Sequence, residues 1–148
     1  MIRTAVVADL PRLRQVYRRS SMSNEGDRVN LLAHGDLLEF PGEGISTERT
    51  RVALDPHSAI IGFTTFLVGG GAMELEDLFV DPPWMRQGVG KALVVDLVAM
   101  ARAHSLARLE VTANPHAMAF YESLGFVAGR DVETRFYPAP RMHLTVRP

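Results

Sequence analysis

The hydrophobic and polar positions of the first fifty residues predict a strand, a helix and a weakly patterned segment. Residues 2–6 form a short apolar run, and Asp9 has the side chain of a helix N-cap. The next apolar residues recur at helical spacing: Leu10, Leu13, Val16 and Tyr17. Residues 21–50 predict only one or two short helices and an irregular loop, and the helices are suggested by Val29, Leu31, Leu32, Leu37 and Leu38.

β-branched and aromatic runs in the middle of the chain predict three consecutive strands. We expect these strands at residues 51–54, 59–68 and 72–80, with tight turns at residues 55–58 and 69–71. The sequence Asp81-Pro82-Pro83 ends the third strand, because proline has no N–H to donate to a neighbouring strand. These three strands therefore form an antiparallel meander.

The second half of the chain predicts a helix, a strand, a second helix and two final strands. Residues 89–104 are apolar on most sides, as in a helix buried against a sheet, and residues 108–112 form a short strand. Asn114 and Pro115 suit the start of a helix that Gly125 ends. Two strands, 126–136 and 142–146, are expected around residues 138–140. The whole order predicts one mixed α/β domain over residues 1–148.

Composition restricts the expected subcellular location and the binding partners of this domain. The chain has 148 residues, of which 47% are hydrophobic and 22% charged, and no apolar run approaches the ~20 residues that a membrane span requires. The first residues lack the features of a secretory signal, so we expect a cytoplasmic protein. The 16 basic and 17 acidic residues are spread along the chain, which argues against a nucleic-acid or membrane surface.

Two residue types restrict the chemistry. The absence of cysteine excludes any mechanism that passes an acyl group through a protein thiol. The five histidines have no spacing typical of a metal site, so no metal is expected. Lys91 is the only lysine, and it lies in a glycine-containing loop.

This loop, Arg86-Gln87-Gly88-Val89-Gly90-Lys91, joins the third meander strand to the apolar helix. A nucleotide-triphosphate P-loop would require glycine at Met85 and a hydroxyl at Ala92, and a dinucleotide fingerprint would require glycine at Leu93. The loop still places main-chain N–H groups at a helix N-terminus, where they can bind a pyrophosphate. The alternative is that the two glycines only permit a tight turn.

Two segments carry a resemblance to a known family. Residues 75–94, LEDLFVDPPWMRQGVGKALV, resemble the acyl-CoA-binding motif of the GNAT superfamily of N-acyltransferases, and residues 109–127, LEVTANPHAMAFYESLGFV, resemble its second motif. One departure is Met85, where the family has Gln or Arg. The resemblance implies an α+β fold with a mainly antiparallel sheet of about seven strands, splayed between the fourth and fifth, and about four helices on its two faces.

The resemblance also implies a binding site for acetyl-CoA as co-substrate. In such a site the backbone groups of Leu78, Phe79 and Val80 contact the pantetheine arm. The pyrophosphate contacts residues 85–91, which are Met85, Arg86, Gln87, Gly88, Val89, Gly90 and Lys91. The second motif adds Asn114, Ala117, Phe120 and Tyr121, and Asn114 also suits a helix cap.

Acid–base roles follow from the same resemblance. Tyr121 matches the family's general acid, and a tyrosine is protonated at neutral pH, although the residue also suits a place in the core. Glu74, Glu76 and Glu110 are candidate general bases. Each of these glutamates could equally be a solvated strand residue, with a water chain as the base.

The expected function is transfer of an acetyl group from acetyl-CoA directly to a primary amine in a ternary complex. The acceptor is a small-molecule amine or a peptide, and the sequence does not specify which; a homodimer is compatible with it. One alternative is a non-catalytic acyl-CoA-binding sensor or partner module of the same fold. Another is a nucleotide-binding fold, in which ATP or NAD would compete with coenzyme A.

Overall fold

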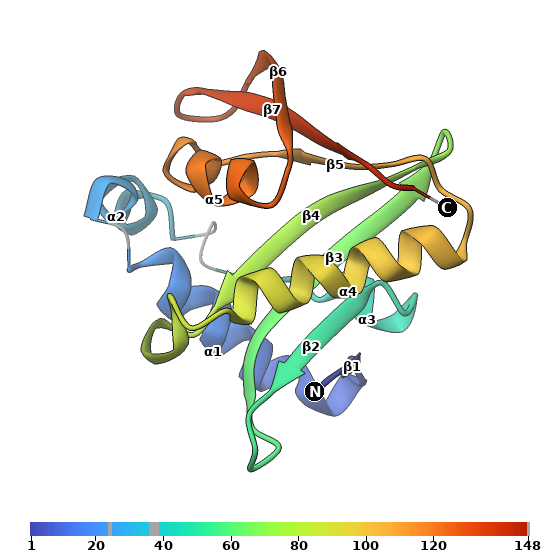
Figure 1. Cartoon of the computed structure of the whole chain (residues 1–148). Coiled ribbons are helices and arrows are strands. Elements are labelled where there is room, and N and C mark those ends of the chain that lie inside the picture. The colour runs from blue at the N-terminus through green and yellow to red at the C-terminus, as the bar shows by residue number, and fades with distance from the viewer. Residues whose placement is uncertain (24, 36–38, 148) are drawn as a thin grey trace. The chain divides into compact units, whose positions relative to one another are not determined.

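The structure, a computed structural model, describes residues 1–23, 25–35 and 39–147 (Figure 1). The chain folds as two compact units. Unit 1 contains Met1–Thr65 and Asp77–Leu93, and unit 2 contains Phe66–Glu76 and Val94–Pro148. Two strands and one helix, β3, β4 and α4, begin in one unit and end in the other.

The helices and strands lie close to the predicted positions. The strands are β1 (Ile2–Thr4), β2 (Thr50–Leu54), β3 (Ile60–Gly69), β4 (Ala72–Val80), β5 (Arg108–Thr112), β6 (Val127–Glu133) and β7 (Pro138–Thr145). The α-helices of the described part are α1 (Leu10–Ser21), α2 (Glu25–Ala33), α3 (Glu43–Ser46), α4 (Val89–Ala103) and α5 (Met118–Ser123). Short 3₁₀ helices are η1 (Val7–Asp9), η3 (Pro82–Trp84) and η4 (Pro115–Ala117).

The strands form a seven-stranded sheet in the order β1-β2-β3-β4-β5-β7-β6. Strands β4 and β5 pair in parallel, whereas β1 with β2, β2 with β3, β5 with β7 and β6 with β7 pair antiparallel. The parallel ladder joins Ala72–Leu75 to residues 108–111, and β4 continues to Val80. The predicted α+β class and the splay between the fourth and fifth strands are confirmed.

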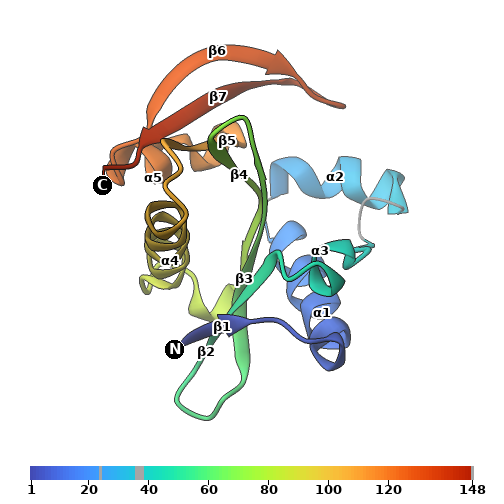
Figure 2. The same ribbon diagram turned by 90° about the vertical axis from the view of Figure 1, so that its right-hand side faces the viewer.

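Unit 1 has apolar side chains on both faces of its strands. One face packs against α1 and α3, which lie on the same side of β1–β3 (Figure 2). Its core residues include Leu13, Val16, Ile45, Val52 and Phe63. On the other face, Ala53 and Ile61 pack against Leu93 of α4. Because α1 buries only one stripe, it is amphipathic, as its sequence pattern predicts.

Unit 2 is built around the order β5-β7-β6, and β6 is its edge strand. Leu109 and Val111 of β5 and Met142 of β7 are buried, whereas most of β6 is exposed. Strand β5 pairs with β7 from Arg108↔Thr145 to Thr112↔Arg141. Side chains of neighbouring strands in unit 2 therefore lie directly opposite each other. The carboxylates on β4 and β5 face each other in this way.

The predicted place of the last turn is wrong. Residues 138–140 lie inside β7, and the β6–β7 connection is formed by residues 134–137. Strand β5 ends at Thr112, opposite Arg141, so the ladder partners of Pro138 and Pro140 lie in β6, at Glu133 and Asp131. Pro140 O also accepts a hydrogen bond from Ala113 N, just beyond β5, at 2.9 Å. A proline with one neighbouring strand loses little pairing, because its missing N–H can face away from the ladder.

Several helix predictions need smaller corrections. Asp9 stands at the N-cap position of α1 but does not cap it; its carboxylate accepts a hydrogen bond from Val6 N (2.8 Å) and pairs with Arg3. The helix expected after Asn114 begins as the 3₁₀ turn η4 before α5. The weakly predicted helix near residue 30 is α2, and Leu37 and Leu38 lie outside the described residues. No helix in the described part is long and apolar enough to cross a membrane.

Candidate functional site

The end of β4 in unit 1 is held by a buried carboxylate, Asp81, which the sequence pattern predicts only as the end of a strand. Asp81 is 3% exposed and donates its backbone N–H to Ile61 O at 2.8 Å. Arg12 of α1 donates to Asp81 Oδ2 at 3.0 Å and, through Nε, to Ile60 O at 3.0 Å. Arg19 Nε lies 3.1 Å from Asp81 Oδ1, so the two groups form an ion pair, but their geometry is not that of a hydrogen bond. Helix α1 therefore fixes the point from which the glycine loop starts.

The loop itself presents main-chain groups. Arg86 and Gly88 both have positive φ, 62° and 86°, and the first helical bond of α4 joins Ala92 N to Gly88 O at 3.0 Å. The N–H groups of residues 88–91 therefore have no acceptor within the helix, as at any helix start. A Cβ on Gly88 would meet no atom within 4 Å, so its importance lies in its backbone conformation. These N–H groups and the positive end of a 15-residue helix suit a bound anion.

The side chains of the loop make few contacts. Gln87 Nε2 donates to Pro83 O at 2.9 Å, which closes the turn on itself. Arg86 and Lys91 are exposed, and Lys91, the only lysine of the chain, lies in the first turn of α4. Met85 is half-buried, and its N–H donates to Pro82 O at 3.2 Å. The departure at Met85 thus places an apolar side chain where a polar one was expected.

Gly62 allows the start of α4 to lie close to the strands. A Cβ at this position would lie 3.0 Å from Phe79 O, 3.1 Å from Val89 Cγ1 and 3.2 Å from Leu93 Cδ1. The first of these atoms belongs to the main chain and cannot rotate away. Any larger residue would push apart β3, the end of β4 and the first turn of α4. The sequence offered no signal for Gly62, because its neighbours in space are 17 to 31 positions away.

The side chains expected near pantetheine are used for packing. Leu78 packs with Ile61 and Leu93, whereas Phe79 packs with Tyr17 and Phe63. Neighbouring residues of a strand point to opposite faces, so both faces of unit 1 anchor this stretch of β4. The pairing with β5 has already ended at Leu75. The backbone groups of residues 78–80 that point away from β3 thus lie beyond the parallel ladder.

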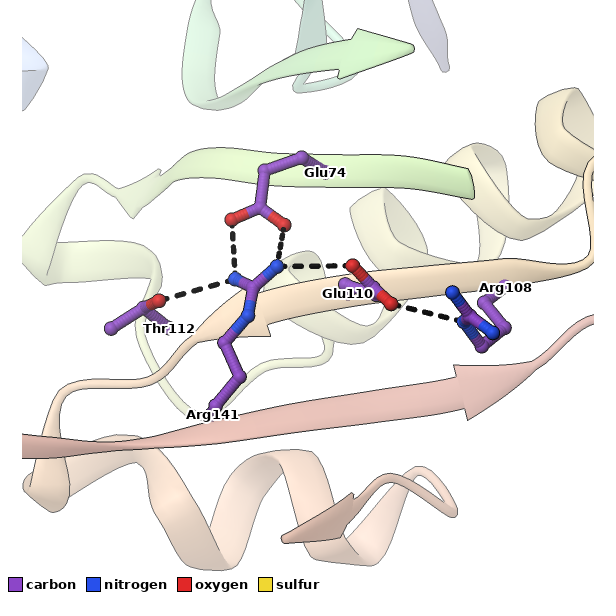
Figure 3. Close-up of polar contacts among 5 residues, drawn as sticks. All are labelled: Glu74, Arg108, Glu110, Thr112 and Arg141. Atoms are coloured by element: carbon purple, nitrogen blue, oxygen red, sulfur yellow. Dashed lines mark hydrogen bonds and ion pairs between the residues drawn. The ribbon is translucent and has the colours of Figure 1, made fainter. Parts of the chain in front are cut away.

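In unit 2, Arg141 joins two of the three predicted carboxylates (Figure 3). Its Nη2 donates to Glu74 Oε2 at 2.7 Å and to Glu110 Oε2 at 3.0 Å, and its Nη1 donates to Glu74 Oε1 and Thr112 Oγ1. Arg108 Nε pairs with the other oxygen of Glu110 at 2.9 Å. The hydrogen bond to Glu74 is the main cause that raises the pKa of Arg141.

Strand register explains this arrangement. Glu74 of β4 lies opposite Glu110 of β5, and Glu110 lies opposite His143 of β7. Two like charges directly across a ladder repel each other, and a guanidinium between them removes the repulsion. The sequence predicted the carboxylates but missed Arg141, because nothing near Arg141 in the sequence indicates a partner 67 residues away. Glu76, the third candidate base, is exposed.

Tyr121 of α5 is 5% exposed. Its ring lies edge-on to Phe120 and Phe126, with centroids 5.1 and 5.2 Å apart. Burial raises the pKa of the Tyr121 hydroxyl well above its usual range, and no described residue forms a hydrogen bond with this hydroxyl. The hydroxyl therefore keeps its proton and retains its capacity to donate.

Asn114 forms the predicted cap at the start of η4. Its Oδ1 accepts from His116 N at 2.9 Å, and its Nδ2 donates to Tyr137 Oη at 2.9 Å. The cap thus also ties the β6–β7 connection to the second motif. Ala117 and Phe120 are half-buried on the same segment.

The structure thus brings the predicted residues together in two groups. In unit 1, residues 78–80 and 85–91 form one continuous path from strand to helix. In unit 2, Arg141 joins Glu74 and Glu110, and residues 114–121 form the turn and helix that carry Tyr121. The residues that sequence reasoning missed are Arg12, Arg19, Gly62, Asp81 and Arg141.

Comparisons with known proteins extend this description. Residues 41–145 match a family model described as the acetyltransferase (GNAT) domain. A glucosamine 6-phosphate N-acetyltransferase from Trypanosoma brucei brucei is 32% identical over 80 residues, and the match covers 49% of this chain and 54% of that protein. The chain thus spans about half the length of this curated relative.

Solved structures share the fold over nearly the whole chain. The PaiA N-acetyltransferase from Thermoplasma acidophilum, in complex with coenzyme A, has a TM-score of 0.79 at 19% identity and covers 98% of each chain. The ribosomal-protein-S18-alanine N-acetyltransferase from Escherichia coli has a TM-score of 0.72 at 23% identity, with 99% of this chain and 93% of that chain covered. At these identities the likeness shows the fold.

The family model covers residues 41–145 and includes both motifs that suggested the resemblance. Its match agrees with the strand order, the parallel β4–β5 ladder and the loop before α4. This chain belongs to the GNAT acetyltransferase domain family.

Proposed function

We propose that the chain is an N-acetyltransferase that moves an acetyl group from acetyl-CoA directly to a primary amine in a ternary complex. The observation that carries the proposal is the loop before α4. There a positive φ at Arg86 and at Gly88 precedes four N–H groups with no helical acceptor, in a chain of the GNAT family. We propose further that residues 1–148 act as one domain, since the family model includes residues of both units.

In this proposal the main chain of residues 85–91 binds the pyrophosphate of acetyl-CoA. Arg86 and Lys91 add positive charge, and the exposure of their side chains supports this role. The backbone of Leu78, Phe79 and Val80 binds the pantetheine arm, because this part of β4 lies beyond its parallel ladder with β5. Asn114, Ala117 and Phe120 add contacts to the donor. Two solved relatives of the same fold contain coenzyme A or acetyl-CoA, which supports the choice of donor.

Tyr121 is the proposed proton donor to the departing thiolate. Its raised pKa keeps the hydroxyl protonated, and it donates to no described residue. General acid assistance of this kind typically contributes about 10²- to 10⁴-fold in rate.

The three predicted glutamates do not identify the general base. Both oxygens of Glu74 and both of Glu110 already accept from arginines, which favours a role in positioning Arg141. Glu76 is exposed and stays a candidate for a water-mediated role.

A thiol-release assay with acetyl-CoA tests the proposal. The acceptor panel contains small amines, amino acids, peptide N-termini and glucosamine 6-phosphate, which is included because of the matched relative. We expect free coenzyme A to form with at least one amine, together with an N-acetylated product of the corresponding mass. Thermal unfolding measured with and without coenzyme A provides an independent readout of donor binding.

Two outcomes would contradict the proposal in different ways. Stabilisation by coenzyme A without thiol release across the panel would favour a non-catalytic acyl-CoA-binding module. The absence of any stabilisation by coenzyme A would argue against the loop as a pyrophosphate site.

A further inference from the structure

The ion pair between Arg12 and Asp81 joins helix α1 to the residue from which the loop at 85–91 is reached. Asp81 is 3% exposed, and Arg12 Nη2 donates to its Oδ2 at 3.0 Å. The other oxygen, Oδ1, forms no hydrogen bond with the described residues. A buried carboxylate of this kind depends strongly on its one hydrogen bond, because loss of the partner leaves a charge away from water.

The guanidinium of Arg12 has a protein acceptor for each of its three nitrogens. Nε donates to Ile60 O at 3.0 Å, Nη1 to Gln15 Oε1 at 2.7 Å, and Nη2 to Asp81. Arg12 thus joins the start of β3 to the end of β4, and every nitrogen of its guanidinium is already engaged. It would therefore act through Asp81 and not by touching the donor.

An irregularity in β3 lies at the same place. The register of β3 against β2 skips Ile61, which is an extra residue on β3. The carbonyl of Ile61 accepts the backbone N–H of Asp81 at 2.8 Å, and the carbonyl of the preceding Ile60 accepts from Arg12. Bulges of this kind redirect a strand locally and are over-represented next to active sites. Asp81 is thus held at the bulge by its main chain and, through Arg12, by its side chain.

The loop continues directly from Asp81 through short hydrogen-bonded turns. Asp81 O accepts from Trp84 N at 2.8 Å, and Pro82 O accepts from Met85 N at 3.2 Å. Each turn is fixed to the one before it. A shift or rotation of Asp81 is therefore passed on to the N–H groups of residues 88–91.

Apolar contacts hold the loop as well. Trp84 and Val89 pack against the apolar cluster that includes Ile61 and Leu93. Apolar attraction is non-directional, whereas hydrogen bonds from a guanidinium to a carboxylate set both distance and direction. The cluster thus keeps the loop close to the strands, and the ion pair at its start sets its orientation.

We propose that Arg12 and Asp81 are positioning residues for donor binding, which hold the N–H groups of residues 88–91 in the orientation that receives the pyrophosphate of acetyl-CoA. This inference rests on the proposed function and adds to it a contribution of helix α1 to donor affinity. All of these residues belong to unit 1. A loop that is fixed in advance loses less conformational freedom on binding, so the pair lowers the dissociation constant without contacting the ligand.

A comparison of two arginines beside the same carboxylate tests the inference. Arg12→Met should raise the dissociation constant for coenzyme A about 10-fold, because the link between β3 and β4 is lost. Arg19→Met removes a charge that lies 3.1 Å from the same carboxylate but has no hydrogen bond with it. It should raise the constant less than about 3-fold. Calorimetric titration measures both values, and equal losses would assign the effect to charge alone and overturn the inference.

A double-mutant cycle tests whether the two residues act as a pair. Asp81→Asn should also raise the dissociation constant about 10-fold, and the variant with both changes should bind less than about 2-fold more weakly than either single variant. Losses that multiply to about 100-fold would show independent roles and overturn the inference. The double variant leaves no isolated charge of the pair, so it should fold even if Arg12→Met does not. Its affinity, compared with that of the wild type, then carries the test.

The ion pair of Arg3 with Asp9 in the same unit is a matched control for stability. The Arg3 and Arg12 side chains are 35% and 31% exposed, and both pair with an aspartate of low exposure. Arg3→Met should lower Tm but keep the dissociation constant for coenzyme A within about 2-fold of the wild-type value. If Arg3→Met weakens donor binding as much as Arg12→Met does, affinity follows general stability and the inference fails.

Separate measurement of binding and turnover distinguishes failure of this inference from failure of the proposed function. In Arg12→Met the KM for acetyl-CoA should rise with the dissociation constant, whereas kcat at saturating donor should stay within about 3-fold. The expected order of affinities without turnover of any amine would support the positioning role and contradict the acetyltransferase activity. Turnover by the wild type with an unchanged KM in Arg12→Met would contradict the positioning role and retain the activity.

Discussion

The glycine loop of unit 1 and the face around Arg141 in unit 2 present polar groups in opposite ways. Residues 85–91 are consecutive in the sequence, and the groups offered to a ligand belong to the main chain. The groups around Arg141 are side chains from three strands, separated by 31 and 67 positions, and they already bind one another. The loop is thus open to a ligand, whereas the face in unit 2 is internally satisfied.

This difference leads to distinct expectations for substitutions. Changes that move the main chain of unit 1 should weaken donor binding, because no side-chain replacement can restore the geometry. Changes at Tyr121 or in the group around Arg141 in unit 2 should alter turnover or stability with little effect on the dissociation constant for coenzyme A. The following substitutions test this division, from the largest expected effect to the smallest.

Tyr121→Phe should lower kcat by about 100-fold or more, because the proposed acid loses its proton. The dissociation constant for coenzyme A should stay within about 2-fold, a change of under ~0.5 kcal/mol. Steady-state thiol release and calorimetric titration measure the two quantities. Tyr137→Phe is the comparison, because it removes the hydroxyl that accepts from Asn114 and removes no proposed proton donor. Its kcat should fall less than about 10-fold. A rate of Tyr121→Phe equal to that of the wild type would remove Tyr121 from the mechanism.

Gly62→Ala should raise the dissociation constant for coenzyme A about 10-fold, equivalent to ~1.4 kcal/mol. The physical reason is the new Cβ, which would lie 3.0 Å from Phe79 O and displace the start of α4 or the end of β4. Gly69→Ala is a matched control at the other end of β3, because a Cβ there meets no atom within 4 Å. Similar affinities in the two variants would show that the close approach at Gly62 is unimportant for binding.

Arg141→Met should lower the free energy of unfolding by about 1 kcal/mol, because Glu74 and Glu110 then face each other uncompensated across the ladder. The Arg141 side chain is 32% exposed, so solvent screening keeps the effect modest, and Tm should fall about 2–4 °C. Adding Glu74→Gln should recover most of the loss, whereas Arg130→Met on the exposed edge strand should change Tm by less than ~1 °C. If Glu74→Gln does not restore the Tm of Arg141→Met, repulsion between Glu74 and Glu110 is not the cause of the lost stability.

Arg86→Gly should have the smallest effect on donor binding, less than about 3-fold, or ~0.7 kcal/mol. Glycine adopts the positive φ of 62° without strain, so the main-chain N–H groups keep their positions when the guanidinium is removed. Arg86→Ala provides the comparison, because it also removes the charge but keeps the Cβ. A loss above 10-fold in both variants would show that the side chain, and not the main chain, dominates at this position.

Most of the fold could be predicted from the sequence, because its signals are local. The extent of β4 follows from the glycines at 69–71 before it and from Pro82 and Pro83 after it, which act on their own neighbours. The prediction failed at Pro138 and Pro140, where local chemistry indicated a break. Proline is acceptable there because the ladder partners of residues 138–140 lie in β6 and the β5–β7 ladder begins only at Arg141. Whether residues 138–140 form a strand or a turn therefore depends on the neighbouring strands and not on the residue types alone.

The candidate site could be predicted only in part for the same reason. The loop at 85–91 and the cap at Asn114 are read from consecutive residues. Gly62, Arg12 and Arg141 act on atoms far away in the sequence, and a single chain offers no sign of those distances.

The single lysine has a consequence for handling the protein with reactive thioesters. Guanidinium groups do not react with acetyl donors under mild conditions, so the chain carries just one side-chain ε-amine, the exposed Lys91 in the first turn of α4. Spontaneous modification during storage with the donor would concentrate there and at the N-terminal amine. The mass of the tryptic peptide that contains Lys91 then reports whether a bound ligand protects the loop from acetylation.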